Sequence, residues 1–276
     1  MLTRKSINEY LLEKINDRRE RESILGELGT IHFLLAETRK AINYYNQALA
    51  ISREIVDRRG EGNHLGNLGN AYSALGETHK AIEYYQQALA IDLEIVDKRG
   101  EGADFNNLGN AYFVLGEVRK AVEYYEQALA VARKIRDKRQ VGALLGNLGL
   151  AYSALGETRK GIEYYEQALA ISREIGDRRG EGDHQGNLGN FYYMQGEVLK
   201  AIEYYERALA IARETGDKRN EGTWLGALGW TFEKLGQQEK AIKCTRAALK
   251  IFDQIESPNA EQARRMLAKL QAEAAE

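Results

Sequence analysis

GNLGN, at residues 66–70, places two glycines and two asparagines where the surrounding apolar spacing is helical. Glycine costs about 0.5–1 kcal/mol relative to alanine in a helix interior, and asparagine is a mediocre helix former. The string nevertheless returns every 40 residues, as NNLGN at 106–110, GNLGL at 146–150, GNLGN at 186–190 and GALGW at 226–230. A fixed period of this length predicts a solenoid of stacked units rather than one globular core.

Each period predicts a helical hairpin. In the second period Leu65, Leu68 and Tyr72 recur at helical spacings of three and four residues. Gly76 is placed to end this first helix, because glycine commonly follows a helix C-terminus. A broader apolar stripe starts near Thr78 and predicts a second helix. The connection is too short for any arrangement but an antiparallel pair.

Repetition of this unit predicts an all-α fold, an α-solenoid of antiparallel helical hairpins. Six hairpins are expected within residues 21–256, at residues 21–60, 61–100, 101–140, 141–180, 181–220 and 221–256. Five aspartates are placed to cap first helices: Asp57, Asp97, Asp137, Asp177 and Asp217.

The two ends of the chain differ from the repeats. Residues 1–20 match the end of a period and are interpreted as the residual second helix of a truncated or decayed repeat. Residues 257–276 open with Ser257 and Pro258, an N-cap and first-turn pair, and predict a C-terminal capping helix. Its expected apolar face is Ala263, Leu267, Leu270 and Ala274.

Composition narrows the class of protein. The formal net charge is −2, so there is no overall attraction to nucleic acid. The sequence has no signal peptide and no apolar run of the roughly 18–20 residues that cross a membrane, so we expect a cytoplasmic protein without membrane contact. Cys244 is the one cysteine and cannot form an internal disulfide, which fits a reducing compartment.

Enzyme chemistry finds no support in the residue pattern. The four histidines lack metal-ligand spacing, and no serine or cysteine has an evident catalytic partner. We therefore expect no catalysis, no metal and no cofactor. A ladder of basic pairs keeps nucleic acid as an alternative: Arg58–Arg59, Lys98–Arg99, Lys138–Arg139, Arg178–Arg179 and Lys218–Arg219. Each pair follows an aspartate beside a helix C-terminus, where cations are favoured in any case, so a solvated surface is preferred.

The repeat resembles the tetratricopeptide repeat. The matching residues, in the order and spacing of that family, are Leu68, Gly69, Tyr72, Gly76, Ala81, Tyr85, Ala88 and Leu89. The usual repeat has 34 residues, and the longer form here resembles kinesin light chain, the Partner-of-Inscuteable spindle adaptors and the sensor arrays of bacterial signalling ATPases. The resemblance implies a right-handed superhelix whose first helices line a concave groove, and a role in protein–protein interaction.

Helical angles of about 100° per residue divide the glycines from the asparagines. Gly69 lies beside the apolar stripe, where a missing side chain lets two helices approach, whereas Asn67 and Asn70 point away from it. The resemblance then places the outward residues on the groove floor. The candidate peptide-binding residues are Asn63, Asn67, Asn70, Asn106, Asn107, Asn110, Asn147, Leu150, Asn187, Asn190, Tyr193, Met194 and Trp230.

Carboxamides carry both donors and acceptors and can bond to a peptide backbone. Gly66, Gly146, Gly186 and Gly226 are expected to leave room for that backbone. The alternative is that the asparagines bond only to neighbouring hairpins. An arginine that holds acidic peptides in the spindle adaptors is replaced by Asn63, Ala103, Ala143, Asp183 and Thr223, so an acidic ligand of that type is not expected.

Two functions remain open. The first is an interaction module that holds a peptide segment of a partner protein in its groove. The second is a sensor or scaffold segment of a larger signalling protein, whose groove faces the rest of the same polypeptide. A monomer is expected, with self-association through exposed terminal repeats as the alternative.

Overall fold

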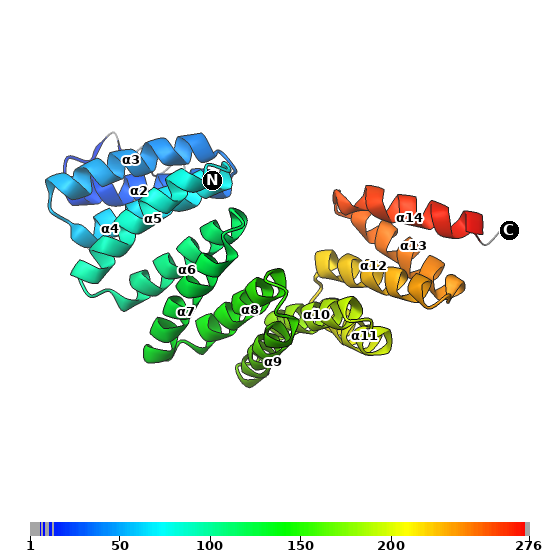
Figure 1. Cartoon of the computed structure of the whole chain (residues 1–276). Helices are drawn as coiled ribbons and strands as arrows, with labels where there is room; N and C mark the ends of the chain where they lie inside the picture. The colour runs from blue at the N-terminus through cyan, green and yellow to red at the C-terminus, as the bar shows by residue number, and fades with distance from the viewer. Residues whose placement is uncertain (1–5, 7, 9–10, 13, 274–276) are drawn as a thin grey trace. The chain divides into compact units, whose positions relative to one another are not determined.

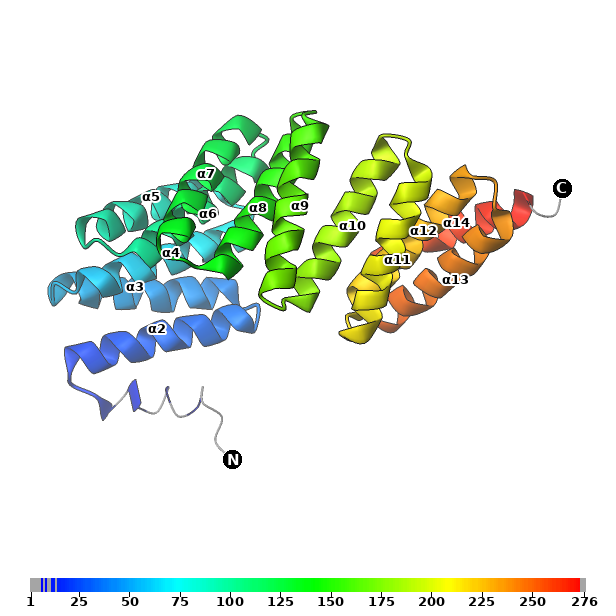
Figure 2. The ribbon, with the colours of Figure 1, turned by 90° about the horizontal axis from the view of Figure 1, so that it is seen from below.

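The computed structural model describes residues 6, 8, 11–12 and 14–273. The chain divides into two compact units, Met1–Asp137 and Lys138–Glu276, and the described residues of each form helical hairpins (Figures 1 and 2). The first unit contains α2 (Arg18–Leu34), α3 (Thr38–Glu54), α4 (Arg58–Ala74), α5 (Thr78–Glu94), α6 (Lys98–Val114) and α7 (Val118–Lys134). The second contains α8 (Lys138–Ala154), α9 (Thr158–Glu174), α10 (Arg178–Met194), α11 (Val198–Glu214), α12 (Lys218–Lys234), α13 (Gln238–Gln254) and α14 (Asn259–Glu273). The all-α hairpin architecture is thereby confirmed.

Residues that were predicted to cap a helix or to follow its end take those places in the structure. The Asp57 side chain accepts from the Gly60 backbone N–H at 2.9 Å at the start of α4, and Asp97, Asp177 and Asp217 cap their helices in the same way. Gly76 has a φ of +77° directly after α4, a conformation that glycine adopts without steric cost.

The recurring spacing of glycine with tyrosine brings the two helices of a hairpin together. A Cβ on Gly69 would lie 2.4 Å from Cε1 of Tyr85, closer than any real contact allows. The same pairing joins Gly29 with Tyr45, Gly109 with Tyr125, Gly149 with Tyr165 and Gly189 with Tyr205. The structural interpretation of this glycine is confirmed: it gives up helix propensity so that a buried aromatic ring can pack against the backbone.

Within each unit, successive hairpins pack through clusters of buried apolar residues. Each second helix packs on its own first helix and, within a unit, on the first helix that follows, as α3 does on α4 and α11 on α12. Leu68, Leu108, Leu148 and Leu188 are fully buried at equivalent positions. Successive first helices also contact one another within each unit, whereas successive second helices make no comparable contact in the described residues. The first helices therefore form the inner wall of each unit.

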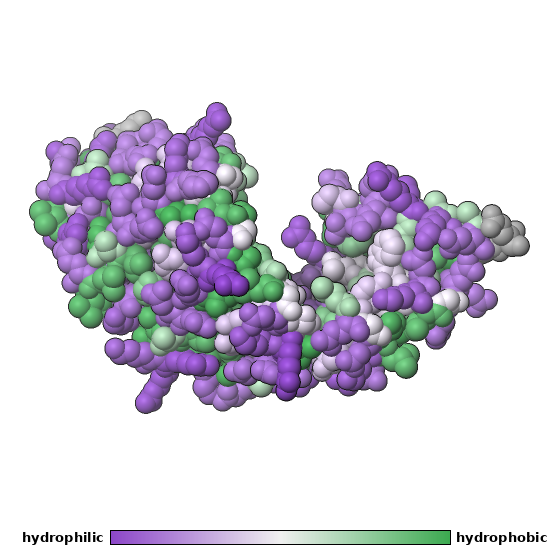
Figure 3. Space-filling model, in the orientation of Figure 1, coloured by the Kyte–Doolittle hydropathy of each residue, from purple (hydrophilic) through white to green (hydrophobic). Residues whose placement is uncertain are grey.

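The basic pairs lie at the start of the first helices, and Arg58 and Arg178 bond to glutamates of the same hairpin. Arg58 Nε donates to Glu94 Oε1 at 3.1 Å across the open end of its hairpin, and Arg178 makes the equivalent bond to Glu214. Figure 3 shows mostly hydrophilic residues on the face in view, interrupted by smaller hydrophobic areas. These pairings support a structural role for the ladder.

Helix α14 covers the last hairpin. The Asn259 N–H donates to Ser257 Oγ at 3.3 Å at its start. Ala263, Met266 and Leu270 are buried against the core that contains Phe252. Met266 thus takes a place that the sequence analysis assigned to Leu267, which is half-buried, and Ala274 lies outside the described residues. Much of residues 1–20 also lies outside them, so the residual-helix interpretation stays a prediction.

Candidate functional site

All the candidate binding residues lie on first helices, α4, α6, α8, α10 and α12. Six of them belong to the first unit and seven to the second. Each unit therefore has its own stretch of wall, and each is described separately.

In the second unit, two pockets lie between α8 and α10 and share Leu150, Tyr165 and Asn187. Their volumes are about 350 and 370 Å³. Together they bring six of the candidates onto one surface: Asn147, Leu150, Asn187, Asn190, Tyr193 and Met194. Leu150 is 48% exposed and Met194 is 70% exposed, so this polar wall contains an apolar area.

Trp230 lies apart from those pockets. It is 40% exposed and lines a smaller pocket of about 210 Å³, formed with Thr245 and with Met266 of α14. Thr245 replaces the tyrosine of the other repeats, and its buried Oγ1 has no hydrogen-bond partner. Helix α14 therefore forms one side of the Trp230 pocket.

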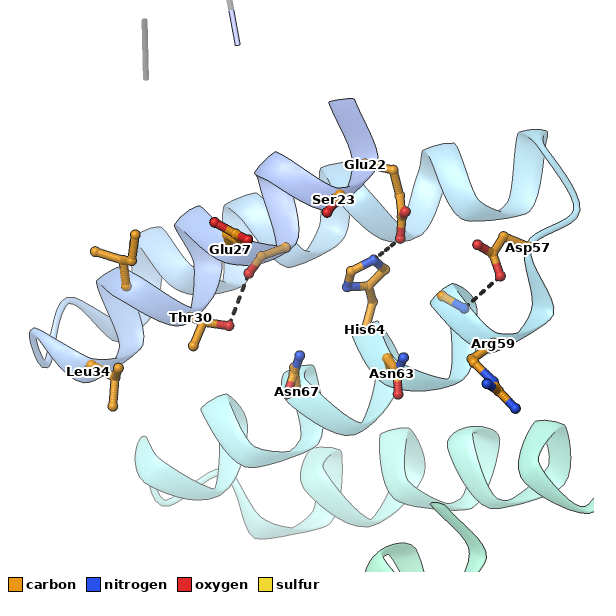
Figure 4. Close-up of a pocket in the computed structure, with 13 residues that line it drawn as sticks. Glu22, Ser23, Glu27, Thr30, Leu34, Asp57, Arg59, Asn63, His64 and Asn67 are labelled. Atoms are coloured by element: carbon orange, nitrogen blue, oxygen red, sulfur yellow. Dashed lines mark hydrogen bonds and ion pairs between the residues drawn. The ribbon is translucent and has the colours of Figure 1, made fainter. Parts of the chain in front are cut away.

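In the first unit, a pocket of about 520 Å³ lies between α2 and α4 (Figure 4). Asn63 and Asn67 line it, together with Glu22 and His64, which the sequence analysis did not include. Glu22 is the exception in its repeat position, where the five later periods have glycine: Gly62, Gly102, Gly142, Gly182 and Gly222. This replacement was the signal that could have identified it.

Three asparagines of the ladder are bonded inside their own hairpins. Tyr85 Oη donates to Asn70 Oδ1 at 2.8 Å, and Tyr125 and Tyr205 make the same bond to Asn110 and Asn190. Burial raises the pKa of Tyr85 and of Tyr125 to about 12, so these phenols stay protonated donors at neutral pH. With Oδ1 engaged, each carboxamide directs its Nδ2 hydrogens away from the tyrosine.

The glycines expected to admit a ligand backbone divide into two groups. A Cβ on Gly186 would lie 2.1 Å from the Trp224 ring, and one on Gly146 would lie 2.9 Å from His184 Cε1. These two glycines accommodate a bulky side chain of the next first helix, and so does Gly26 with His64. A Cβ on Gly66 would make only an ordinary contact at 3.8 Å, and one on Gly226 would meet no other atom within 4 Å.

Two buried carboxyl groups of the first unit face each other between α5 and α6. Burial raises the pKa of Asp104 to about 8, and the neighbouring charge of Asp92 adds to the shift. Burial likewise raises the pKa of Asp92 to about 6, with Asp97 as a further negative neighbour. Asp104 Oδ2 has no hydrogen-bond partner. The pair therefore holds a proton near neutral pH.

Neither a metal centre nor a membrane span is found in residues 6, 8, 11–12 and 14–273. Among them, no group of three or more histidines, cysteines, aspartates and glutamates could hold a metal ion. No helix in the same part of the chain has the length and apolar character to cross a membrane.

A tetratricopeptide repeat family model matches residues 20–94, 104–174 and 181–254, which is most of the sequence. The chain belongs to the tetratricopeptide repeat family. Membership indicates a role in protein–protein interaction for this hairpin array. A search of curated proteins found no match.

Several solved tetratricopeptide-like structures are similar to the chain. A signal-transduction ATPase with a tetratricopeptide repeat sensor, from Pyrococcus horikoshii, has a TM-score of 0.81 and 23% identity over 96% of this chain and 40% of that one. BtubC (BKLC) from P. vanneervenii has a TM-score of 0.70 and 22% identity over 79% of this chain and 92% of that one. A Rap protein complexed with Competence and Sporulation Factor has a TM-score of 0.64 and 18% identity over 100% of this chain and 88% of that one. At these identities the likeness shows a shared fold.

Proposed function

We propose that the first-helix walls bind an extended or helical segment of a partner protein, and that the asparagines donate hydrogen bonds to its main-chain carbonyl groups. The observation that carries the proposal is the tyrosine bond to Asn70, Asn110 and Asn190. Each bond occupies the carboxamide oxygen and leaves two N–H donors for a ligand. The wall therefore favours ligands that offer hydrogen-bond acceptors. The main-chain carbonyl groups of any peptide are such acceptors.

Apolar residues next to these donors supply side-chain contacts. Leu150, Tyr193 and Met194 line the second-unit pocket that also contains Asn187 and Asn190. Aromatic and methionine side chains in such positions commonly anchor a bound segment. The similarity of the fold to a Rap protein complexed with a factor supports a ligand-binding role for such an array.

The test replaces donors without removing the acceptor that each tyrosine needs. Asparagine-to-alanine changes leave a buried phenol unpaired, which confounds binding with stability. Asn70→Asp with Asn110→Asp keeps both acceptors and removes both donors. Asn43→Asp with Asn46→Asp is the matched control, since it adds the same charge at exposed positions of α3.

The probe is a set of N-acetylated dodecapeptides selected from a random phage-displayed library on the wild-type protein. Two lost hydrogen bonds of about 1 kcal/mol each should weaken binding to the first unit roughly thirtyfold. The control pair should change affinity less than threefold. Failure to select any peptide, or equal affinity of both variants, would overturn the proposal.

A second candidate function is that of a sensor segment within a larger signalling protein. The specific support is the similarity to the Pyrococcus horikoshii ATPase, of which the chain covers 40%. Sequencing the complete gene tests this directly. A nucleotide-binding domain in the same reading frame supports it, and a complete gene encoding the repeats alone refutes it.

A further inference from the structure

The pocket between α2 and α4 differs in charge from the rest of the wall. Glu22, Glu27 and Asp57 line it, whereas Arg59 is the one cation among its lining residues, which gives three negative charges and one positive. Arg59 in turn pairs with Asp97, a residue outside the lining, at 3.7 Å. The pocket is therefore a concentration of negative charge next to Asn63 and Asn67.

A buried imidazole without a second partner lies inside this pocket. His64 is only 6% exposed, and its Nε2 lies against Glu22 Oε1. Glu22 Oε1 also accepts from Ser52 Oγ at 2.9 Å. His64 Nδ1 is buried and has no hydrogen-bond partner. Figure 4 shows the ring between Glu22 and the asparagines, where Gly26 leaves space for it.

The carboxylates around this imidazole favour a ligand with N–H groups. The carboxylates of Glu22, Glu27 and Asp57 accept hydrogen bonds and do not donate them when they are ionised. The same carboxylates favour a donor that is also positively charged.

We infer that this pocket binds the cationic side chain of an arginine or lysine in the partner segment, an inference that rests on the proposed peptide-binding function. The head group lies among the carboxylates and His64, and the aliphatic stem packs on Ile31 and Leu34, which line the same pocket. The first unit thereby selects a basic residue.

The equivalent pocket of the second unit is less negative. It is lined by Asp177, Asp183 and Arg139, which gives two negative charges and one positive. Two α2 carboxylates of the first-unit pocket are replaced 120 residues later by uncharged residues, Glu22 by Gly142 and Glu27 by Asn147, so the equivalent histidine, His184, has no glutamate at the position of Glu22. The stronger basic preference thus belongs to the first-unit pocket.

The experiment uses the full chain and two small probes, N-acetyl-arginine methylamide and its neutral analogue N-acetyl-citrulline methylamide. Probe binding is followed by ¹⁵N nuclear magnetic resonance of Gly26, His64 and Asn67. We expect the arginine probe to shift these resonances with an affinity at least tenfold higher than the citrulline probe. Equal shifts from both probes, or no shift at Gly26 and His64, would overturn the inference.

Two lysine variants locate the effect. Ser23→Lys places an ammonium group in the pocket from an exposed position of α2, and should weaken the arginine probe at least tenfold. Ala103→Lys adds the same charge at the equivalent exposed position of α6 and should leave affinity within twofold. Equal effects of the two variants would contradict the assignment to this pocket.

The same probes separate this inference from the proposed function. If random peptides bind the wild type but show no arginine or lysine preference that Ser23→Lys removes, the peptide function stands and the basic subsite is wrong. If no peptide binds while the arginine probe does, the subsite stands as a site for a cation and the peptide function fails.

Discussion

Alanine at Gly69 and at Gly66 should change stability in opposite directions, although both lie three residues apart on α4. A Cβ at position 69 would lie 2.4 Å and 2.6 Å from two carbons of the buried Tyr85 ring. Ordinary van der Waals contact needs about 1 Å more, and such overpacking costs about 1–3 kcal/mol. Alanine recovers about 0.5–1 kcal/mol of helix propensity. Gly69→Ala should therefore lose roughly 1–2 kcal/mol of stability.

At Gly66 the added Cβ meets only Asp104 Oδ1 at 3.8 Å. Here the propensity gain is unopposed, so Gly66→Ala should gain about 0.5–1 kcal/mol. Urea denaturation followed by circular dichroism measures both changes, and the two variants should differ by about 2 kcal/mol. Equal stability of the two variants would refute the steric role assigned to the glycine that faces tyrosine.

Three further outcomes follow from the structure. Val56 and Val96 have φ values of +58° and +59°, at a position where two later repeats have Gly176 and Gly216. Replacing both valines, Val56→Gly with Val96→Gly, should therefore raise the unfolding free energy by about 1 kcal/mol per site. An unchanged urea midpoint would contradict this. The raised pKa of Asp104, near 8 when folded, means that its contribution to stability is complete below the unfolded value of about 4 and is lost as the pH rises towards 8. Asp104→Asn should therefore flatten the fall in melting temperature between pH 4 and pH 8, and an unaltered pH profile would count against the buried carboxyl pair. Truncation after Ser257 should expose Ile251 and Phe252 and cause self-association in sedimentation experiments, whereas an unchanged monomer with unchanged melting would show that α14 is not a cap.

The fold was predictable from the sequence because the repeats share the same steric requirements. Gly69 faces Tyr85, Asp57 caps α4 and Gly76 follows its end, and all three recur with the period. Such local signals agree with one another over most of the six copies, and so the helix boundaries follow closely from them.

The candidate site was predictable only in part. Periodicity places Asn70 on the outward side of α4, but its bond to Tyr85, 15 residues later, depends on how deeply the two helices interlock. Gly146 and Gly186 look like space for a ligand in the sequence, whereas His184 and Trp224 of the next first helix fill that space. The contacts of Gly146 and Gly186 join different hairpins, and a one-dimensional pattern does not contain them.

The first-unit pocket between α2 and α4 was not predicted from the sequence, for a related reason. Glu22 and His64 are 42 residues apart and meet only when α2 and α4 lie side by side. The visible signal was an exception to the repeat, a glutamate where the later periods have glycine. Departures from the period, rather than the period itself, therefore mark where this chain differs from a generic array.

The side-chain amide signals of Asn70 and Asn110 test the central claim most directly. On addition of a selected peptide, ¹⁵N–¹H spectra should show downfield shifts and slowed hydrogen exchange of their Nδ2 protons, because these protons then bond to peptide carbonyl oxygens. The corresponding signals of Asn43 and Asn46 on α3 should stay unchanged. Saturation with peptide that leaves Asn70 and Asn110 unperturbed, or that shifts only the α3 asparagines, would contradict binding along the first-helix wall.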